Sequence, residues 1–382
     1  MSDKPVENPA VEAAPSETAV EAPATAATTE AVPDVVETPA AAAAPAEEAK
    51  PVEESAAVPA AVAEEKPAET PAVAPTAAVE EAPVETATET SAITPIQALY
   101  TAAKEHGHPE VWGVTLADPA TDVPSQIIFQ KYLNANDGNL DKAKDQLLKT
   151  LAWRAKTKPL ELLARAYNSE KFSGLGYVTS YTAEGTYDPA APETKEVFTW
   201  NVYGNTKSID QTFGDLQEFL NWRVALMELA LQELLLATAT KTITTDYDPY
   251  KIFQVHDYKS ISFLRQSPHV KAASTETIKV FAQNYPELLK EKFFVNVPVI
   301  MGFVYAFMKL LVAAKTIKKF HPMSNGVNLA GEFSDSSIKG LGQRLPTEYG
   351  GKAGELKALG KETQIEAEPV AKVEEAVAVS TA

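Results

Sequence analysis

The sequence predicts an α/β protein in which a mainly parallel sheet follows a small helical bundle, with low-complexity tails on both sides. Residues 94–154 repeat apolar side chains at helical spacing, and residues 198–322 alternate strand-like runs with helix-periodic segments. Residues 1–90 consist almost wholly of Ala, Pro, Glu, Val and Thr. We therefore expect a disordered acidic tail over 1–92, a helical domain over 93–168, an α/β ligand-binding domain over 169–355 and a second disordered tail over 356–382.

The net charge of −18 is concentrated in the N-terminal tail, where residues 1–90 carry 19 acidic and 3 basic side chains. The first aromatic residue of the chain is Tyr100. A segment without aromatic residues buries too little apolar surface to offset the entropy of ordering it. We interpret the tail as a spacer, with a partner motif as the alternative. Since the rest of the chain is nearly neutral, we expect no nucleic-acid partner.

Several function classes are excluded by missing residues. The chain has no cysteine, which removes disulfides, thiolate metal sites and covalently attached haem. No GxxxxGK, GxSxG or HExxH motif occurs, which argues against nucleotide hydrolysis, an α/β-hydrolase and a zinc protease. His106 and His108 form a short pair, and two histidines without a third ligand are more typical of a loop than of a metal site.

Membrane contact is expected to be peripheral. The start of the chain lacks a basic segment followed by an apolar one, so we expect no signal peptide. The longest apolar stretch, 293–314, is interrupted by Asn296, Pro298, Gly302 and Lys309. It falls short of the roughly 20 apolar residues that span a bilayer. We expect a soluble cytoplasmic monomer that touches the endoplasmic reticulum, microsomes or the plasma membrane from outside.

The helical domain begins with a clear start signal. Thr94 is a good N-cap residue, and Pro95 suits the first helical position. Ile96, Leu99 and Ala103 then follow at helical spacing. Further helices are expected near Ile127 and over 140–154, so the segment is a small bundle.

The α/β domain is predicted from alternating patterns. Strand-like runs occupy 198–203, 251–258, 292–298 and 319–322. Helical patterns occupy 213–237, 275–281 and 300–314. The helix at 300–314 is apolar on nearly every side, which is typical either of a core helix or of a gate over a lipid pocket.

The run Phe253-Gln254-Val255-His256-Asp257-Tyr258 places two polar aromatic groups on one strand face. Side chains alternate along a strand, so His256 and Tyr258 point the same way, roughly 7 Å apart. They form either a hydrogen-bonded polar patch or a cofactor site. A Tyr phenolate is a hard oxygen ligand suited to ferric haem, with His as its neighbour.

These residues resemble a known family. Asn284 to Leu289 (NYPELL), Phe293 to Pro298 (FFVNVP), Lys315 to Lys319 (KTIKK) and Leu345 to Gly351 (LPTEYGG) are similar to the signature of CRAL-TRIO (Sec-fourteen-like) lipid-transfer domains. Gln130 to Leu133 and Leu151 to Arg154 resemble the helical domain that precedes them. The resemblance covers about residues 94–355. It implies an α/β pocket that encloses one lipid under a gating helix.

The resemblance also implies specific roles. In phosphatidylinositol-binding members, a Glu after Tyr-Pro and a Lys about 32 residues later contact the head group. Those positions are Glu287 and Lys319 here. A carboxylate accepts from inositol hydroxyls, and an ammonium pairs with phosphate.

Val255 to Ser260 and Phe219 to Arg223 are similar to the fungal non-classical branch of phosphatidylinositol transfer proteins, that of the fifth yeast Sec-fourteen homologue, which is a haem-binding group. That similarity implies haem b with ferric iron on Tyr258 and His256 beside it. Arg223 and Lys292 fall where cations approach the haem propionates. Asn136 stands where the branch can carry another tyrosine, with Tyr132 one helical turn away.

Three interpretations follow for one pocket. The first is a carrier that binds and exchanges phosphatidylinositol, contributes to phosphoinositide homeostasis and also binds ferric haem, without enzymatic turnover. The second is a haem sensor, store or redox protein in which lipid transfer is secondary. The third is a scaffold with an empty pocket. This interpretation is disfavoured, because the residues that line a large empty apolar cavity would lose packing contacts.

Overall fold

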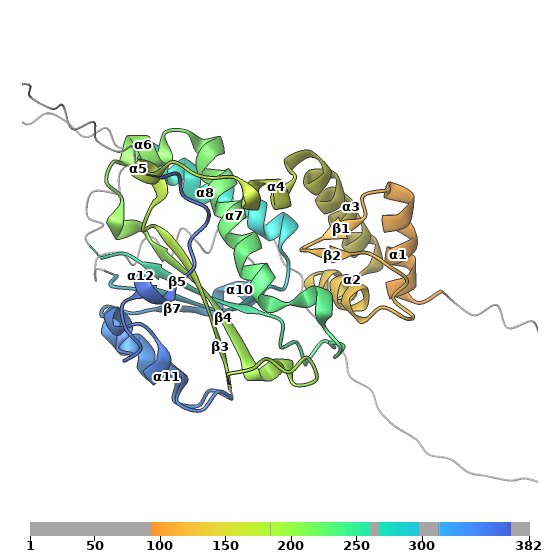
Figure 1. The fold of residues 1–382 in the computed structure, drawn as a ribbon. Helices are drawn as coiled ribbons and strands as arrows, with labels where there is room; N and C mark the ends of the chain where they lie inside the picture. Colours follow the sequence, from red (N-terminus) through yellow and green to blue (C-terminus); the bar gives the residue numbers. More distant parts are fainter. Residues whose placement is uncertain (1–92, 184, 260–266, 298–311, 313, 368–382) are drawn as a thin grey trace, which may run out of the picture. The chain divides into compact units, whose positions relative to one another are not determined.

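The structure, a computed structural model, describes residues 93–183, 185–259, 267–297, 312 and 314–367 (Figure 1). The predicted tail over 1–92 and most of the predicted helix over 300–314 lie outside these residues. The helical part consists of α1 (Pro95–His106), β1 (Glu110–Val111), β2 (Val114–Thr115), α2 (Val123–Ala135), α3 (Leu140–Thr157), α4 (Pro159–Ala164) and α5 (Ser169–Phe172).

The start of α1 confirms the predicted cap. The Thr94 side chain accepts a hydrogen bond from the Gln97 amide, and Pro95 fills the first turn. The helix ends at Gly107, whose φ of 85° lies in the left-handed region that glycine adopts easily because it has no Cβ. Local sequence thus sets both ends of this helix.

A five-stranded sheet forms the centre of the α/β part. Its strands are β3 (Gly176–Thr182), β4 (Lys195–Val202), β5 (Ile252–Asp257), β6 (Leu289–Val295) and β7 (Phe320–Pro322), in the order β3-β4-β5-β6-β7. The pairings from β4 to β7 are parallel, and β3 pairs antiparallel with β4. The mainly parallel sheet is confirmed. The edge strand β3 was not predicted.

The helices that cover the sheet differ from the predicted ones mainly at their starts. After α6 (Ile209–Phe213), α7 (Leu216–Leu234) starts at Leu216 because the Asp215 side chain caps it by accepting from the Glu218 amide. Helix α8 (Pro268–Asn284) starts well before the predicted Thr275. Ala314, the end of the predicted apolar helix, begins the short α10 (Ala314–Ile317).

Two buried clusters lie on opposite faces of the sheet. One includes Ile252 with residues of α7 and α8, and the other includes Phe253 with residues of η6 (Gly326–Phe333) and α11 (Leu341–Arg344). In Figure 1, α7 and α8 lie on one side of the sheet and α11 on the other. No helix among the described residues is long and apolar enough to cross a bilayer.

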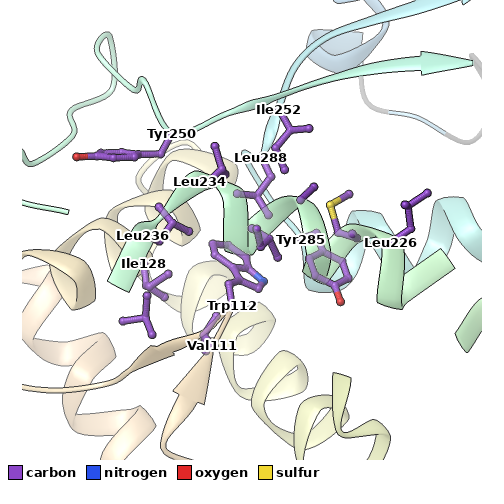
Figure 2. Close-up of a cluster of buried hydrophobic side chains, with 14 of the residues drawn as sticks. Val111, Trp112, Ile128, Leu226, Leu234, Leu236, Tyr250, Ile252, Tyr285 and Leu288 are labelled. Atoms are coloured by element: carbon purple, nitrogen blue, oxygen red, sulfur yellow. The ribbon is translucent and has the colours of Figure 1, made fainter. Parts of the chain in front are cut away.

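The first cluster continues into the helical part. Figure 2 shows Trp112 of that part close to Tyr285 and Leu288 of the α/β part, in a cluster that also includes Ile128 and Tyr250. The indole of Trp112 is 5.7 Å from the Tyr132 ring and 6.5 Å from the Tyr285 ring, in stacked arrangements. The two predicted domains therefore share one hydrophobic core.

The C-terminal tail predicted from residue 356 is wrong over its first part. Helix α12 (Leu356–Leu359) packs with Leu356 only 4% exposed. Lys361 then pairs with Val178 of β3, and Ile365 pairs with Tyr167. Composition resembled a tail here, but backbone pairing and a buried leucine tie residues 356–367 to the body.

Candidate functional site

Glu287 stands in the turn between α8 and β6, with its carboxylate among three lysines. Its φ is 54°, in the left-handed region that a side chain rarely adopts. Oε1 lies 3.6 Å from Lys315 Nζ, and Oε2 lies 3.7 Å from Lys251 Nζ and 3.9 Å from Lys319 Nζ. The Glu287 side chain is 17% exposed. One acceptor group therefore stands among donors that solvent can reach.

The three lysines are held by different elements. Lys319 Nζ donates to the Leu289 carbonyl at 2.9 Å, and Lys315 Nζ donates to the last carbonyls of α2, those of Asn134 and Ala135, at 3.2 Å. Burial and the positive charge of Lys251 lower the pKa of Lys319. This cluster offers a carboxylate for hydroxyl groups and ammonium groups for phosphate.

A second polar cluster lies on the sheet face that α7 and α8 cover. His256 is on the same face of β5 as Ile252, opposite Phe253 and Val255. Its ring centroid is 5.7 Å from those of Tyr203 and Phe294. Tyr258, just past the strand, packs 6.1 Å from Phe294 and against the same core. The predicted common face of His256 and Tyr258 is confirmed.

Two cations border these rings. Arg223 of α7 lies over the rings of Trp222 and Phe281, at 5.7 and 5.4 Å. Lys292 of β6 lies over the rings of Phe294 and Phe320, at 5.3 and 5.7 Å. Neither cation forms an ion pair with a carboxylate within the described residues.

The cluster is electrostatically unbalanced. Burial and the neighbouring Arg223 lower the pKa of Lys292 to about 7. Burial, Lys292 and Arg223 hold the pKa of His256 well below its usual range. His256 Nε2 and Arg223 Nε are buried without a hydrogen-bond partner in the described part of the chain. Unpaired donors and cations in an apolar setting are costly, so this cluster favours an anionic partner over a neutral one.

Comparisons with known proteins place this architecture. The family model "CRAL/TRIO domain" matches residues 200–351, and "CRAL/TRIO, N-terminal domain" matches residues 85–149. The phosphatidylinositol transfer protein sfh-5 of Neurospora crassa is 60% identical over 275 residues, which are 72% of this chain and 76% of that protein. The chain belongs to the CRAL/TRIO family.

Another relative and a solved structure agree with this assignment. The phosphatidylinositol transfer protein SFH5 of Chaetomium globosum is 74% identical over 268 residues, which are 70% of this chain but only 61% of that relative. A crystal structure of Sfh5 matches with a TM-score of 0.56 and 26% identity, covering 72% of this chain and 90% of that one. The CRAL/TRIO fold is thus shared at the level of backbone arrangement.

The CRAL/TRIO fold brings most of the predicted site residues into two groups. Glu287 and Lys319 form the first group, while Tyr258, His256, Arg223 and Lys292 form the second. Asn136 belongs to neither, according to the contacts of the described residues. Its amide donates to the Tyr132 carbonyl at 2.9 Å and to Gln146 Oε1 at 2.7 Å, because it caps α2 beside α3.

The prediction missed Lys251 and Lys315, which also face Glu287. Lys315 stands in the same KTIKK run as Lys319, four positions earlier, so this spacing was the available signal. Lys251 carried no signal, since strand pairing alone brings it to the turn. Among the described residues, no group of three His, Asp or Glu side chains could hold a metal ion, and His108 instead lies 3.9 Å from Glu110.

Proposed function

We propose that this chain binds phosphatidylinositol and transfers it between membranes without covalent chemistry. The names of its CRAL/TRIO relatives support this, since the proteins from Neurospora crassa and Chaetomium globosum are called phosphatidylinositol transfer proteins. The observation that carries the proposal is the Glu287 carboxylate, 3.9 Å from the Lys319 ammonium and partly open to solvent. Inositol hydroxyls would donate to Glu287, and the phosphate would pair with Lys319.

The test is transfer of labelled phosphatidylinositol between vesicles by Glu287→Gln combined with Lys319→Met. We expect this double variant to lose transfer while its melting temperature stays near that of the unmodified chain, because both side chains are partly exposed. Lys361→Met, on the far edge of the sheet, is the matched lysine control. Undiminished transfer by the double variant would show that Glu287 and Lys319 do not bind the head group.

We propose ferric haem as a second ligand of the same domain. The specific observation in its favour is the pair Arg223 and Lys292, which have no carboxylate partner in the described residues and suit the two propionates. Tyr258 would supply the iron ligand, with His256 beside it. Bound haem would supply a redox-active iron, which leaves open a sensor, storage or redox role.

The side chains of this cluster are of the kinds that bind haem, but the Tyr258 phenol has to lose its proton first. Burial and Tyr203 raise the pKa of Tyr258, so the free phenol holds its proton at neutral pH. Tyr258 would hold the iron as a phenolate, so haem binding would release this proton. Asn136 has no place in this proposal, because its amide is bonded within the helical part.

The test is the absorption spectrum of the full chain titrated with haemin. We expect Tyr258→Phe to lose or shift the phenolate-to-iron charge-transfer bands. Tyr247→Phe should leave them unchanged, because this partly buried tyrosine lies elsewhere and donates to Glu193. Identical spectra for Tyr258→Phe and the unmodified chain would remove Tyr258 as ligand. The monomeric state and the location at the endoplasmic reticulum and plasma membrane stay predictions.

A further inference from the structure

The stretch 282–287, which ends in Glu287, is bound along its backbone by the helical part of the chain. Gln146 Nε2 donates to the carbonyls of Ala282 and Gln283, both at 3.1 Å. Thr150 Oγ1 also donates to the Gln283 carbonyl, at 3.2 Å. Side chains of α3 therefore hold the last carbonyls of α8.

The next two residues are held by Trp112. Its indole N–H donates to the Asn284 carbonyl at 3.0 Å, and its ring stacks near the ring of Tyr285 (Figure 2). The Tyr285 hydroxyl donates to Glu228 Oε1 at 2.7 Å, and Glu228 in turn pairs with the buried Arg154 at 2.7 Å. The turn before Glu287 is thus fixed on two sides.

Lys131 of α2 completes this set at Glu287 itself. Its ammonium group donates to the Glu287 carbonyl at 2.9 Å, to the Tyr250 carbonyl at 2.8 Å and to Asp248 Oδ2 at 2.7 Å. The side chain is fully buried, so all three donors are used inside the protein. Burying an ammonium group carries a desolvation cost, and apolar residues could fill the same space with equal stability.

The position of this carbonyl matters because Glu287 has an unfavourable backbone. A non-glycine residue at positive φ needs contacts that outweigh its steric cost. The Lys131 bond fixes the carbonyl of Glu287, while the carboxylate of the same residue faces Lys251, Lys315 and Lys319. Without that bond the backbone at Glu287 could leave its positive-φ conformation, which would turn the side chain and its carboxylate away from the lysines.

We propose that Lys131 is a positioning residue for lipid selection, which holds the backbone of Glu287 so that its carboxylate meets the inositol ring. The helical part then serves recognition as well as stability. This inference rests on the proposed phosphatidylinositol function. It adds a role for a buried residue outside the ligand's reach.

The test compares the lipids that the purified full chain takes up from vesicles containing equal phosphatidylinositol and phosphatidylcholine, measured by mass spectrometry. In Lys131→Met we expect the ratio of the two lipids to fall about tenfold, a typical coupling between contacting groups, while the total lipid load stays unchanged. The matched control is Leu147→Ala, which weakens the same helical core without touching Glu287. It should melt at a lower temperature and keep the lipid ratio.

A double-mutant cycle separates positioning from general damage. If Lys131 acts through the Glu287 carboxylate, Lys131→Met should cause no further loss of selectivity in a Glu287→Gln background. Should Lys131→Met fail to fold, Gln146→Ala is the second variant. It removes the bond to the Ala282 carbonyl and one of the two bonds to the Gln283 carbonyl, and it should lower the ratio in the same direction.

Four outcomes decide the matter. A folded Lys131→Met with the original lipid ratio overturns the inference. An additive loss of selectivity in the double variant overturns it as well. If Gln146→Ala has to replace Lys131→Met, an unchanged lipid ratio in Gln146→Ala has the same meaning. An unmodified chain that takes up lipid but does not prefer phosphatidylinositol overturns the proposed function instead, and the inference with it.

Discussion

Replacing Lys292 with methionine should make the protein more stable, although it removes a residue of the second polar cluster. The Lys292 ammonium lies over two phenyl rings and has no carboxylate partner in the described residues. Methionine has nearly the same length and no charge, so it can occupy the same space. The expected gain comes from removing a charge that burial and Arg223 disfavour.

The magnitude and the pH dependence follow from the pKa of Lys292, which falls from 10.5 to about 7 on folding. At about 1.4 kcal/mol for each tenfold change in proton affinity, this corresponds to a cost of at most ~5 kcal/mol. Since the Lys292 side chain is mostly but not completely buried, solvent screening reduces this cost to roughly 2–3 kcal/mol. The folded state binds fewer protons than the unfolded state between pH 7 and 10.5, so stability from this group rises with pH across that window. The cost is complete below pH 7.

The assay is urea unfolding of the full chain at pH 6 and at pH 9.5. We expect Lys292→Met to raise the free energy of unfolding at pH 6, with a smaller gain at pH 9.5. The control is Lys290→Met on the same strand, because Lys290 pairs with Glu196 and its loss leaves a buried carboxylate alone. That variant should be destabilised. A destabilised Lys292→Met at pH 6 would refute the reasoning and indicate an acid partner for Lys292.

Three further variants test individual contacts elsewhere in the fold. Arg154→Met should lower the free energy of unfolding by about 3–5 kcal/mol, since it leaves the buried Glu228 without its cation. A loss below about 1 kcal/mol in urea unfolding would contradict this. Thr94→Ala should cost about 1 kcal/mol by removing the α1 cap, and unchanged thermal melting would show that the cap contributes nothing. Gly351→Ala should abolish soluble folded protein on gel filtration, because a Cβ there would lie 1.8 Å from the Leu345 carbonyl oxygen; a normal elution profile would show that the turn can move.

Sequence reasoning succeeded where local patterns decide the outcome. Thr94 and Pro95 predict the start of α1 correctly, and alternation along β5 predicts that His256 faces away from Phe253. The pairing of Glu287 with Lys319 came from family resemblance. No periodicity would bring together two residues from separate connections of a parallel sheet.

The missed features depend on contacts between distant segments. Strand β3 (GYVTSYT) buries Tyr177 and Tyr181 on one face and Val178 on the other, so no alternation of apolar and polar residues marked it before it paired with β4. Lys131 would be assigned to the surface by residue type, yet it is buried because Asp248 and two carbonyls meet it there. Residues 356–367 have no aromatic residue and resembled the tail in composition, yet they pair with the body.

That segment has a consequence for synthesis of the protein in the cell. Val178 of the edge strand β3 exchanges backbone hydrogen bonds with Lys361, at 2.8 and 2.9 Å, and the two lie about 180 residues apart in the chain. A ribosome adding about 5–20 residues each second needs roughly 10–40 s to make the residues between them. During that interval the outer edge of β3 can pair with a neighbouring chain, and unpaired edges promote aggregation. Chaperone demand should therefore be greatest while residues 179–360 are being translated, and it should fall once Lys361 has left the exit tunnel.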